Sequence, residues 1–380
     1  MTQRLFDIDS YKQDFTAKCL SAEEIKNEQN QTVYKIVLDA TCFFPEGGGQ
    51  KSDKGTLNGI PVFDVQEENG VIYHFTASPI SVGDTVNGKI DWNERFYKMQ
   101  NHTAEHIVSG IIHKKFGFDN VGFHLGEDFI TMDYNGEISQ SQLLEIEKEA
   151  NEAVWANLPV TAWYPENPKE FSYRSKLDLA ENVRLVKIES IDLCACCAPH
   201  VAFTGEIGYI LILSCQRFRQ GIRITAKCGR FALDEIQKQQ QVLKNASHLL
   251  SLPVLEIDLG IEKLKTTLES TRFALVGAQK KLLFFEIEKS DCPFVFVEDP
   301  TLLKDGANLL FDKFSSFVCA FCGNDKDGYR FMALFSENQK DKCEIFKKVL
   351  SASGGGGNNM LQGMAKATKK QILAFAKEFL

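Results

Sequence analysis

The sequence lacks any apolar run long enough to cross a membrane. A membrane helix needs about 20 consecutive, mostly apolar residues, and no stretch of this chain approaches that length. The N-terminal stretch MTQRLFD also lacks the apolar segment of a secretory signal. We therefore expect a cytoplasmic protein without a membrane-spanning segment.

The sequence has fewer basic than acidic residues. The chain has 43 lysines and arginines against 51 aspartates and glutamates, which gives a formal net charge of -8. This balance argues against nonspecific nucleic-acid binding over the whole surface. A local contact with phosphate is compatible with it.

The number of cysteines does not allow all of them to form disulfide bonds within one chain. There are 11 of them, an odd number, and no secretory signal accompanies them. Cysteines in such a chain are expected to stay reduced. Their thiols are then free to bind a metal ion.

The first two thirds of the chain predict two different architectures. Residues 1–91 alternate short apolar runs with turn signals, which predicts a small antiparallel β-barrel. Residues 92–230 begin with a helical pattern that ends at Gly117 and continue with strands and a second long helix. Within them, HVAFTG (200–205) is expected to be a strand. This region predicts an α+β domain.

The last third predicts a helical arm and a further small domain. Residues 231–285 are rich in Leu, Lys, Gln and Glu, with Pro253 and Gly260 as interruptions. Such a helical arm could pair with a second copy, and we expect a homodimer. Residues 286–380 alternate strands and helices as in a small α/β domain with a Gly-rich loop. The predicted fold class of the chain as a whole is α+β.

Two histidines four residues apart form the first candidate site. They are His102 and His106 in NHTAEH (101–106), and residues four apart share one face of a helix. Glu105 completes an HxxEH pattern, in which a protease would use the glutamate as general base. The pattern alone leaves a metalloprotease and other metal sites open.

The second candidate cluster is DLCACCAPHVAFTG (192–205). It offers Cys194, Cys196, Cys197 and His200, and thiolates and imidazoles are good zinc ligands. The two clusters together predict a zinc site of histidine and cysteine ligands. An HxxEH protease would need a downstream carboxylate ligand instead, so this cluster argues against a protease.

These motifs resemble those of the alanyl-tRNA synthetase editing domain. NHTAEH and CCAPHV (196–201) look like its His-x-x-x-His and Cys-x-x-x-His pair, and TCFFPEGGGQKSDKG (41–55) is similar to the Gly-rich segment before that domain. SGGGGNNMLQG (353–363) is similar to the Gly-rich end of the synthetase's C-terminal domain. With no nucleotide-binding signature, the chain resembles the long form of the free-standing AlaX editing proteins.

The resemblance implies a hydrolase acting on tRNA(Ala) mischarged with serine or glycine. Carried over residue by residue, it implies Zn2+ held by His102, His106, Cys196 and His200. Cys194 and Cys197 match no ligand position and are taken as neighbours.

Further site residues are predicted around this centre. Gln50 and Thr103 are expected to make polar contacts in catalysis, and Glu105 is a candidate base. The backbone of Gly47, Gly48 and Gly49 could approach the tRNA 3′ end closely, and His124 is a candidate pocket residue.

Two further predictions concern a second cysteine motif and an alternative function. Cys319 and Cys322 form a single CxxC inside an apparent strand and are expected to be core thiols on opposite faces. A zinc-stabilised tRNA-binding protein without catalysis is the alternative from another functional class.

Overall fold

The computed structural model describes the chain except residues 28–29, 176–182, 358 and 379–380. Contacts divide it into two compact units, Met1–Val242 and Leu243–Leu380. Within the described residues, no helix is long and apolar enough to cross a membrane. The predicted domain boundaries at 91, 230 and 285 are not tested by this division and stay predictions.

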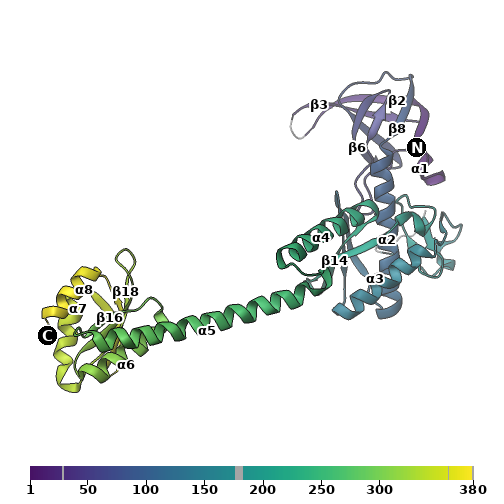
Figure 1. The fold of residues 1–380 in the computed structure, drawn as a ribbon. Helices are drawn as coiled ribbons and strands as arrows, with labels where there is room; N and C mark the ends of the chain where they lie inside the picture. The colour runs from purple at the N-terminus through teal and green to yellow at the C-terminus, as the bar shows by residue number, and fades with distance from the viewer. Residues whose placement is uncertain (28–29, 176–182, 358, 379–380) are drawn as a thin grey trace. The chain divides into compact units, whose positions relative to one another are not determined.

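Six antiparallel strands of the first unit close into a barrel, drawn in purple in Figure 1. In sequence order they are β2 (Asp14–Lys26), β3 (Thr32–Leu38), β5 (Gly55–Leu57), β6 (Ile60–Glu68), β7 (Val71–Thr76) and β8 (Thr85–Ile90). Every second residue of β7 and β8 is buried, so one side of each strand fills the interior. This topology agrees with the barrel predicted for residues 1–91.

A short N-terminal segment precedes the barrel. It consists of β1 (Gln3–Arg4) and α1 (Leu5–Ile8), and β1 pairs in parallel with β4 (Ala40–Thr41).

Helix α2 (Trp92–Phe116) leads from the barrel into the α+β part of the unit (Figure 1). It begins at Asp91, whose side chain accepts a hydrogen bond from the Glu94 backbone. It ends at Gly117, which has φ 70° in the left-handed region. The predicted end of the helix at Gly117 is therefore confirmed.

Two small sheets complete the first unit. The larger has the order β14-β15-β10-β9, and the smaller has the order β11-β12-β13. Their strands are β9 (Asn120–Leu125), β10 (Ile130–Tyr134), β11 (Val160–Trp163), β12 (Leu185–Ile188), β13 (Asp192–Ala195), β14 (Ile210–Phe218) and β15 (Gly221–Cys228). The predicted second helix is α3 (Gln140–Trp155), which begins with a capping box at Ser139. Strands and helices are thus mixed as predicted.

The strand predicted for residues 200–205 is wrong. These residues form a loop that leads into a 3-10 helix, Thr204–Ile207. Phe203 makes an isolated β-bridge with Pro159, and Val160 N of β11 donates to the Ala202 carbonyl oxygen, but the bonding does not continue as a ladder. Val201 N donates to Thr103 Oγ1 and Ala202 N donates to Tyr11 Oη. The alternation of apolar residues could not reveal these distant partners.

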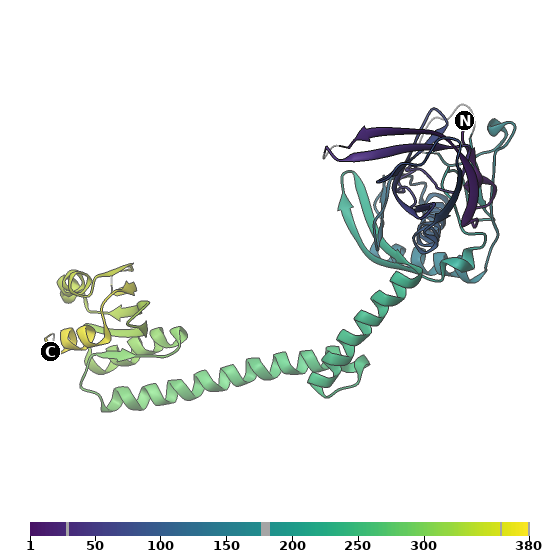
Figure 2. The ribbon, with the colours of Figure 1, turned by 90° about the horizontal axis from the view of Figure 1, so that it is seen from above.

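The second unit is a five-stranded sheet with helices on both faces (Figures 1 and 2). Its strand order is β16-β17-β18-β20-β19. The strands are β16 (Phe294–Phe296), β17 (Val318–Asn324), β18 (Gly328–Leu334), β19 (Ala352–Gly355) and β20 (Met360–Ala365). Residues of α5 (Ile257–Lys289) and α6 (Leu303–Phe314) form one apolar cluster with the sheet. Residues of α7 (Lys340–Val349) and α8 (Lys369–Glu378) form another.

The CxxC pair lies in the core of this unit, as predicted. Cys319 and Cys322 belong to β17 and are buried in different apolar clusters, one on each face of the sheet. Period-two alternation of a strand explains this separation.

The predicted arm and Gly-rich loop differ from the structure in detail. The arm region consists of α4 (Gly229–Leu250) and α5, separated near Pro253, whereas Gly260 lies inside α5 and interrupts nothing. Gly354 and Gly355, predicted to lie in a loop, are the end of edge strand β19.

Candidate metal centre

One face of α2 carries the first three side chains of the site. His102, Glu105 and His106 are three and four residues apart, and each is at most 3% exposed. The turn before β13 packs directly against this helix, because a Cβ at Gly110 would lie 2.7 Å from the Ile191 carbonyl oxygen. A side chain at position 110 would push that turn, and with it β13, away from the histidines.

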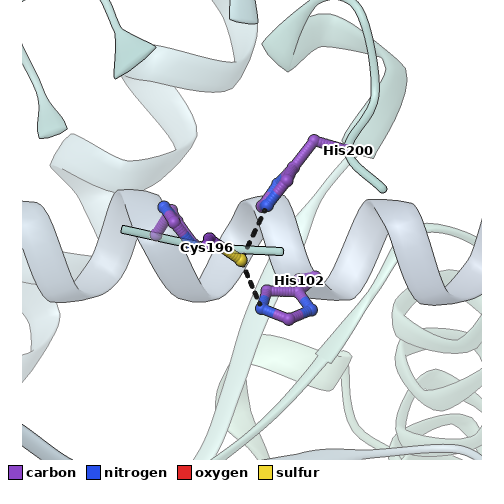
Figure 3. Close-up of side chains that lie close together, drawn as sticks. His102, Cys196 and His200 are labelled. Atoms are coloured by element: carbon purple, nitrogen blue, oxygen red, sulfur yellow. Dashed lines mark hydrogen bonds between the residues drawn. The ribbon is translucent and has the colours of Figure 1, made fainter. Parts of the chain in front are cut away.

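Strand β13 and the loop after it deliver the remaining ligands. Cys196 follows the strand directly, and His200 follows four residues later. The Cys196 Sγ atom lies 3.4 Å from His102 Nε2 and 3.4 Å from His200 Nε2 (Figure 3). The ligand atoms of all four predicted residues, His106 included, lie within 4.8 Å of one another. The structure thus gathers the predicted set from two parts of the chain about ninety residues apart.

Each histidine uses its other ring nitrogen on a protein partner. His102 Nδ1 lies 3.1 Å from Gln50 Oε1, and His106 Nδ1 lies 3.1 Å from Asp192 Oδ2. Metal-binding histidines are commonly oriented by such contacts on the second nitrogen.

The third histidine has a hydroxyl partner with a defined direction. The Thr103 hydroxyl donates to the Met99 carbonyl oxygen at 2.8 Å, so its oxygen accepts from His200 Nδ1 at 3.0 Å. The lone pair of His200 is then on Nε2, which faces Cys196. Three imidazoles held in this way around one thiol fit a zinc ion.

The cysteines differ in their readiness to act as ligands. Burial raises the pKa of the Cys194 thiol to about 11. Burial also opposes ionisation of Cys196, but the imidazoles of His102 and His200 outweigh it and hold the pKa of that thiol well below its usual value. Thiolate is the form that binds metal, so Cys196 is the best suited of the two. Cys197 is exposed and has no place in the group of four.

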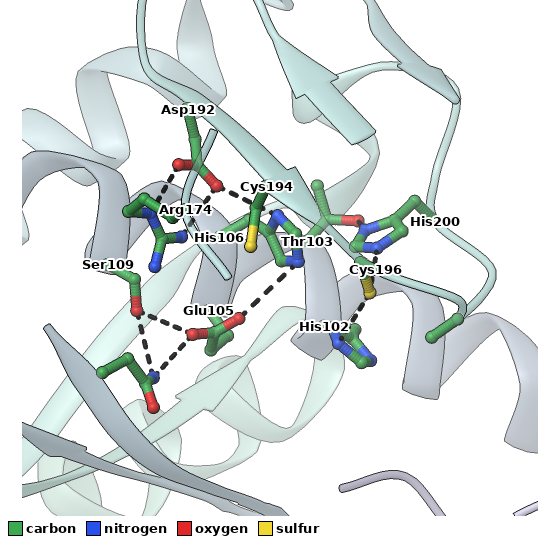
Figure 4. A network of polar contacts seen from close by, with 12 residues as sticks. His102, Thr103, Glu105, His106, Ser109, Arg174, Asp192, Cys194, Cys196 and His200 are labelled. Atoms are coloured by element: carbon green, nitrogen blue, oxygen red, sulfur yellow. Dashed lines mark hydrogen bonds and ion pairs between the residues drawn. The ribbon is translucent and has the colours of Figure 1, made fainter. Parts of the chain in front are cut away.

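A second cluster of polar side chains adjoins the first (Figure 4). His106, Asp192 and Cys194 also place ligand atoms within 4.8 Å of one another. Arg174 binds both oxygens of Asp192, at 2.7 and 2.8 Å. The Asp192 carboxyl is buried, yet the contacts with His106 and Arg174 lower its pKa to about 2. Asp192 is therefore ionised, and it is the ion-pair partner of both His106 and Arg174.

The Gly-rich segment forms a tight turn over His102. Gly47 and Gln50 exchange two backbone hydrogen bonds of 3.0 Å. Gly48 has φ 61°, and a Cβ on it would lie 3.9 Å from His102 Cε1. Gly49 has φ 83°, and a Cβ there would lie 2.7 Å from the Phe123 carbonyl oxygen. The glycines let the turn pass between the histidine and β9, and they place Gln50 against His102.

Three of the four candidate ligands, His102, His106 and Cys196, line a cavity of about 420 Å³. Its walls include His102, Glu105, His106, Gly48 and Gly49, and also Phe123, whose ring centroid is 4.9 Å from that of His102. His124 is the next residue of the same strand, is exposed and does not line the cavity. Its predicted role as a pocket residue stays a prediction.

The sequence did not reveal several residues of the site. Phe123 and Arg174 come from segments without a motif. The same holds for Asn120, whose Nδ2 donates to Glu105 Oε1 at 2.6 Å. Asp192 had a signal, because Asp192, Cys194 and Cys196 alternate with period two at a strand end and could all face α2.

Two family patterns match the chain. One is described as tRNA synthetases class II (A) and matches residues 6–94. The other is described as Threonyl and Alanyl tRNA synthetase second additional domain and matches residues 183–241. The second match contains Asp192, Cys196 and His200.

A full-length relative decides the family. Alanyl-tRNA editing protein AlaX-L of Pyrococcus horikoshii is 27% identical over 408 aligned residues, which cover 100% of this chain and 98% of that protein. This chain belongs to the AlaX family of alanyl-tRNA editing proteins.

Alanine–tRNA ligases are also related to this AlaX-family chain. The ligase of Methanococcus maripaludis is 30% identical over 374 residues, which cover 90% of this chain and 40% of the ligase. The ligase of Halobacterium salinarum is 34% identical over 280 residues, which cover 70% of this chain and 30% of the ligase. The chain thus spans less than half the length of these ligases.

Proposed function

We propose that this protein hydrolyses the aminoacyl ester of tRNA(Ala) mischarged with serine, and also with glycine. The observation that carries the proposal is the group of His102, His106, Cys196 and His200, the first three of which line a cavity. The similarity to an alanyl-tRNA editing protein over nearly the whole of both chains supports the choice of substrate. We propose zinc as the metal, because one thiolate and three imidazoles are ligands that it accepts.

A bound zinc ion would supply positive charge that can polarise an ester carbonyl or lower the pKa of water. The residues of the chain set the conditions around it. Gln50, Thr103 and Asp192 fix the ring orientation of the three histidines. The turn at Gly47–Gln50 and the ring of Phe123 narrow the cavity beside His102.

Gln50, Thr103 and Glu105 are proposed to act in catalysis, Thr103 by orienting His200 rather than by touching the substrate. Gln50 is 1% exposed, and its Nε2 atom has no hydrogen-bond partner among the described residues. A buried donor without a partner is costly, so an acceptor atom of the substrate would stabilise it. The backbone of Gly47, Gly48 and Gly49 and the side chain of His124 are also proposed to contact the substrate.

A second candidate function follows from the number of ligands. Four protein ligands fill the coordination sphere of a tetrahedral zinc ion, and closed sites of this kind are usually structural. A zinc-stabilised tRNA-binding protein would have the same four residues and no hydrolytic activity. Catalysis at this site requires either that one ligand yields or that the substrate joins as a fifth.

Deacylation assays separate the two functions. We expect the protein to hydrolyse Ser-tRNA(Ala) and Gly-tRNA(Ala) and to leave Ala-tRNA(Ala) largely intact. Cys196→Ala should lose both zinc, measured by elemental analysis, and deacylation. Cys197→Ala is the matched control, because its thiol is adjacent but outside the group of four.

Each outcome of this assay has a distinct meaning. A wild-type protein that binds zinc and tRNA but spares all three esters would support the non-catalytic function. Stoichiometric zinc in Cys196→Ala would contradict the ligand assignment. Cleavage of peptides with no action on the esters would favour an HxxEH protease.

We also propose that the protein forms a homodimer through α5. Apolar residues recur every seven positions on this helix, at Ile261, Leu268, Leu275 and Leu282, and all four are more than half exposed. One apolar residue every seven positions corresponds to one of the two apolar positions of a coiled-coil heptad, which supports pairing with a second copy of this helix.

A further inference from the structure

A second cavity of the first unit, with a volume of about 700 Å³, lies beside the candidate metal centre. Its walls come from the segment after the Gly-rich turn, from α2, from the end of β9 and from the start of α4. None of the four candidate metal ligands lines it. Cavities of this size hold small organic ligands, and the proposed chemistry at the metal centre leaves this one without a role.

The two cavities share two of their walls. On α2, Lys98 lines this cavity, and His102, four residues later, lines the cavity at the metal centre. In the Gly-rich segment, Gly49 lines the cavity at the metal centre and Lys51 lines this one. A hydrogen bond of 3.3 Å from Leu125 N, at this cavity, to the Gly49 carbonyl oxygen joins the walls. Positions four residues apart on a helix are separated by about 6 Å along its axis, so the cavities are direct neighbours.

Aromatic rings form much of this cavity's surface. Four of its lining side chains are aromatic and only partly buried: Trp92, Phe96, Tyr97 and Phe231. The ring centroids of Trp92 and Phe96 are 5.5 Å apart, and those of Tyr97 and Phe231 are 4.6 Å apart. Each ring is thus held by a neighbour. Nucleobases stack on partly exposed aromatic rings of this kind.

Lysines line the same cavity next to the Gly-rich turn. Lys51 and Lys54 are exposed, and Lys98 Nζ fixes the backbone between them by donating to the Ser52 carbonyl oxygen at 2.6 Å. Lys54 and Lys98 share one carboxylate, that of Glu94, at 3.4 and 2.8 Å. The side chain of Lys51 has no hydrogen bond or ion pair among the described residues. This side of the cavity therefore has more positive than negative charge, which suits a phosphate group.

The opposite side of the cavity has a different charge. There Arg230 pairs with Asp234 at 3.8 Å, and Glu127 adds an exposed carboxylate. A second phosphate would be repelled on this side. The charges therefore favour a single phosphate, placed at the lysines, with an uncharged base inside the cavity.

We propose that this cavity binds one nucleotide of the tRNA acceptor strand, with its base on the aromatic rings and its phosphate at Lys51 and Lys54. The inference rests on the proposed function, which brings the terminal adenosine of the substrate to the neighbouring cavity. The bound nucleotide is then one of those just before that adenosine. The contact supplies affinity for RNA that does not depend on the acyl group.

RNA fragments of increasing length test the proposal. Adenosine monophosphate and fragments of two, three and four nucleotides that end like tRNA in CCA are titrated into the full-length protein by calorimetry. Affinity should rise by about 10-fold to 100-fold at the length that first fills the cavity, the range expected for one stacked base. A fragment of that length without this one base should lose most of the rise.

Lys51→Gln combined with Lys54→Gln tests the phosphate contact. This double variant should bind the fragment that fills the cavity about 10-fold more weakly. The slope of log affinity against log salt concentration should also fall by about 0.7, the value for one phosphate of a single strand. A structural role of the lysines alone would leave this slope unchanged.

The matched control is Lys18→Gln combined with Lys26→Gln. Both lysines are exposed residues of β2 in the same barrel and do not line the cavity. This variant loses the same charge and should keep the wild-type affinity and salt dependence. An equal loss in both double variants would indicate nonspecific attraction and overturn the inference.

The other outcomes separate the inference from the proposed function. Unchanged binding in the Lys51 and Lys54 variant overturns the inference and leaves hydrolysis of Ser-tRNA(Ala) unaffected. Adenosine monophosphate that binds as tightly as the longest fragment would assign the cavity to a free nucleotide and overturn it as well. Wild-type protein that binds the fragments as expected but does not hydrolyse Ser-tRNA(Ala) supports the nucleotide site and refutes the hydrolase.

Discussion

The surroundings of Thr103 in the structure differ from those predicted, and the difference changes the role expected of this residue. It was expected to contact substrate, but its side chain is fully buried between Met99, His200 and Val201. Its oxygen is the acceptor that keeps the lone pair of His200 directed at Cys196. This arrangement predicts a positioning effect on metal affinity.

Thr103→Val should lower zinc affinity by about 10-fold to 100-fold, the usual effect of removing such a partner. Valine has nearly the same shape but leaves His200 Nδ1 without its acceptor. Competition against a chromogenic chelator measures the change. Unchanged zinc affinity together with a raised KM would instead support a direct substrate contact.

Individual site residues could be predicted from the sequence where a strong metal-binding residue type occurs at a characteristic spacing from another. His102, His106, Cys196 and His200 could be predicted because each is a strong metal ligand at a fixed spacing from another. Arg174 could not be predicted, because an arginine in a polar segment carries no sign of the carboxylate it will meet. Its two hydrogen bonds to Asp192 exist only after β13 has been placed against α2.

Among the elements, the junction of α2 with the barrel depends on one buried ion pair. Arg95 is fully buried and binds Asp53, and it also donates to the Cys42 carbonyl oxygen at 2.6 Å. Removal of one member of a buried pair leaves the other charge unpaired and costs about 3–5 kcal/mol.

Arg95→Met should therefore lower the free energy of unfolding of the first unit by about that amount. All three tryptophans lie in this unit, so urea unfolding followed by fluorescence reports on it. Arg223→Met is the control, because its pair with Asp133 is partly exposed and such pairs contribute at most about 1 kcal/mol. Equal effects of the two substitutions would contradict the structural role of Arg95.

The barrel should also lose stability in mild acid because of His74. Burial lowers the pKa of this imidazole from 6.5 to about 4, and the ring lies 2.8 Å from Thr41 Oγ1. The unfolded chain takes up a proton below pH 6.5, whereas the folded barrel resists it until pH 4. The contribution of neutral His74 to the stability of the barrel is thus complete above pH 6.5 and is lost as the pH falls towards 4.

We expect the free energy of unfolding to fall by about 3 kcal/mol between pH 6.5 and pH 4. His74→Gln cannot take up the proton and should flatten this part of the stability profile. Urea unfolding at a series of pH values, followed by tryptophan fluorescence, measures both profiles. A wild-type profile as flat as that of the variant would contradict the assignment to His74.

Helices were easier to predict than strands, for a physical reason. The ends of α2 and α3 are marked by local chemistry, with Gly117 in a left-handed conformation and Ser139 in a capping box. Strands β2 and β8 have no such marks, and they pair with each other across about seventy residues of sequence. The error at 200–205 has the same origin, since its hydrogen bonds reach Thr103 and Tyr11.

On the scale of the whole molecule, α5 has more exposed apolar surface than a lone helix usually carries. Leu268 is 71% exposed and Leu275 is 57% exposed, and both lie on the seven-residue repeat. Charged and polar residues occupy positions between them, as in the segment LKTTLESTRFAL (264–275). Exposed apolar stripes of this length usually mark an interface, and a seven-residue period suits a second identical helix.

The full-length protein should therefore have twice the mass of a single 42.8 kDa chain in light scattering. Leu268→Lys combined with Leu275→Lys should convert it to a monomer, because each introduces a charge into the seam of both copies. Thr266→Lys is the control, since this exposed residue lies off the repeat. A monomeric wild-type protein at micromolar concentration would contradict the interface. A dimer that persists in the double variant would place the contact elsewhere and leave the apolar repeat of α5 to another partner.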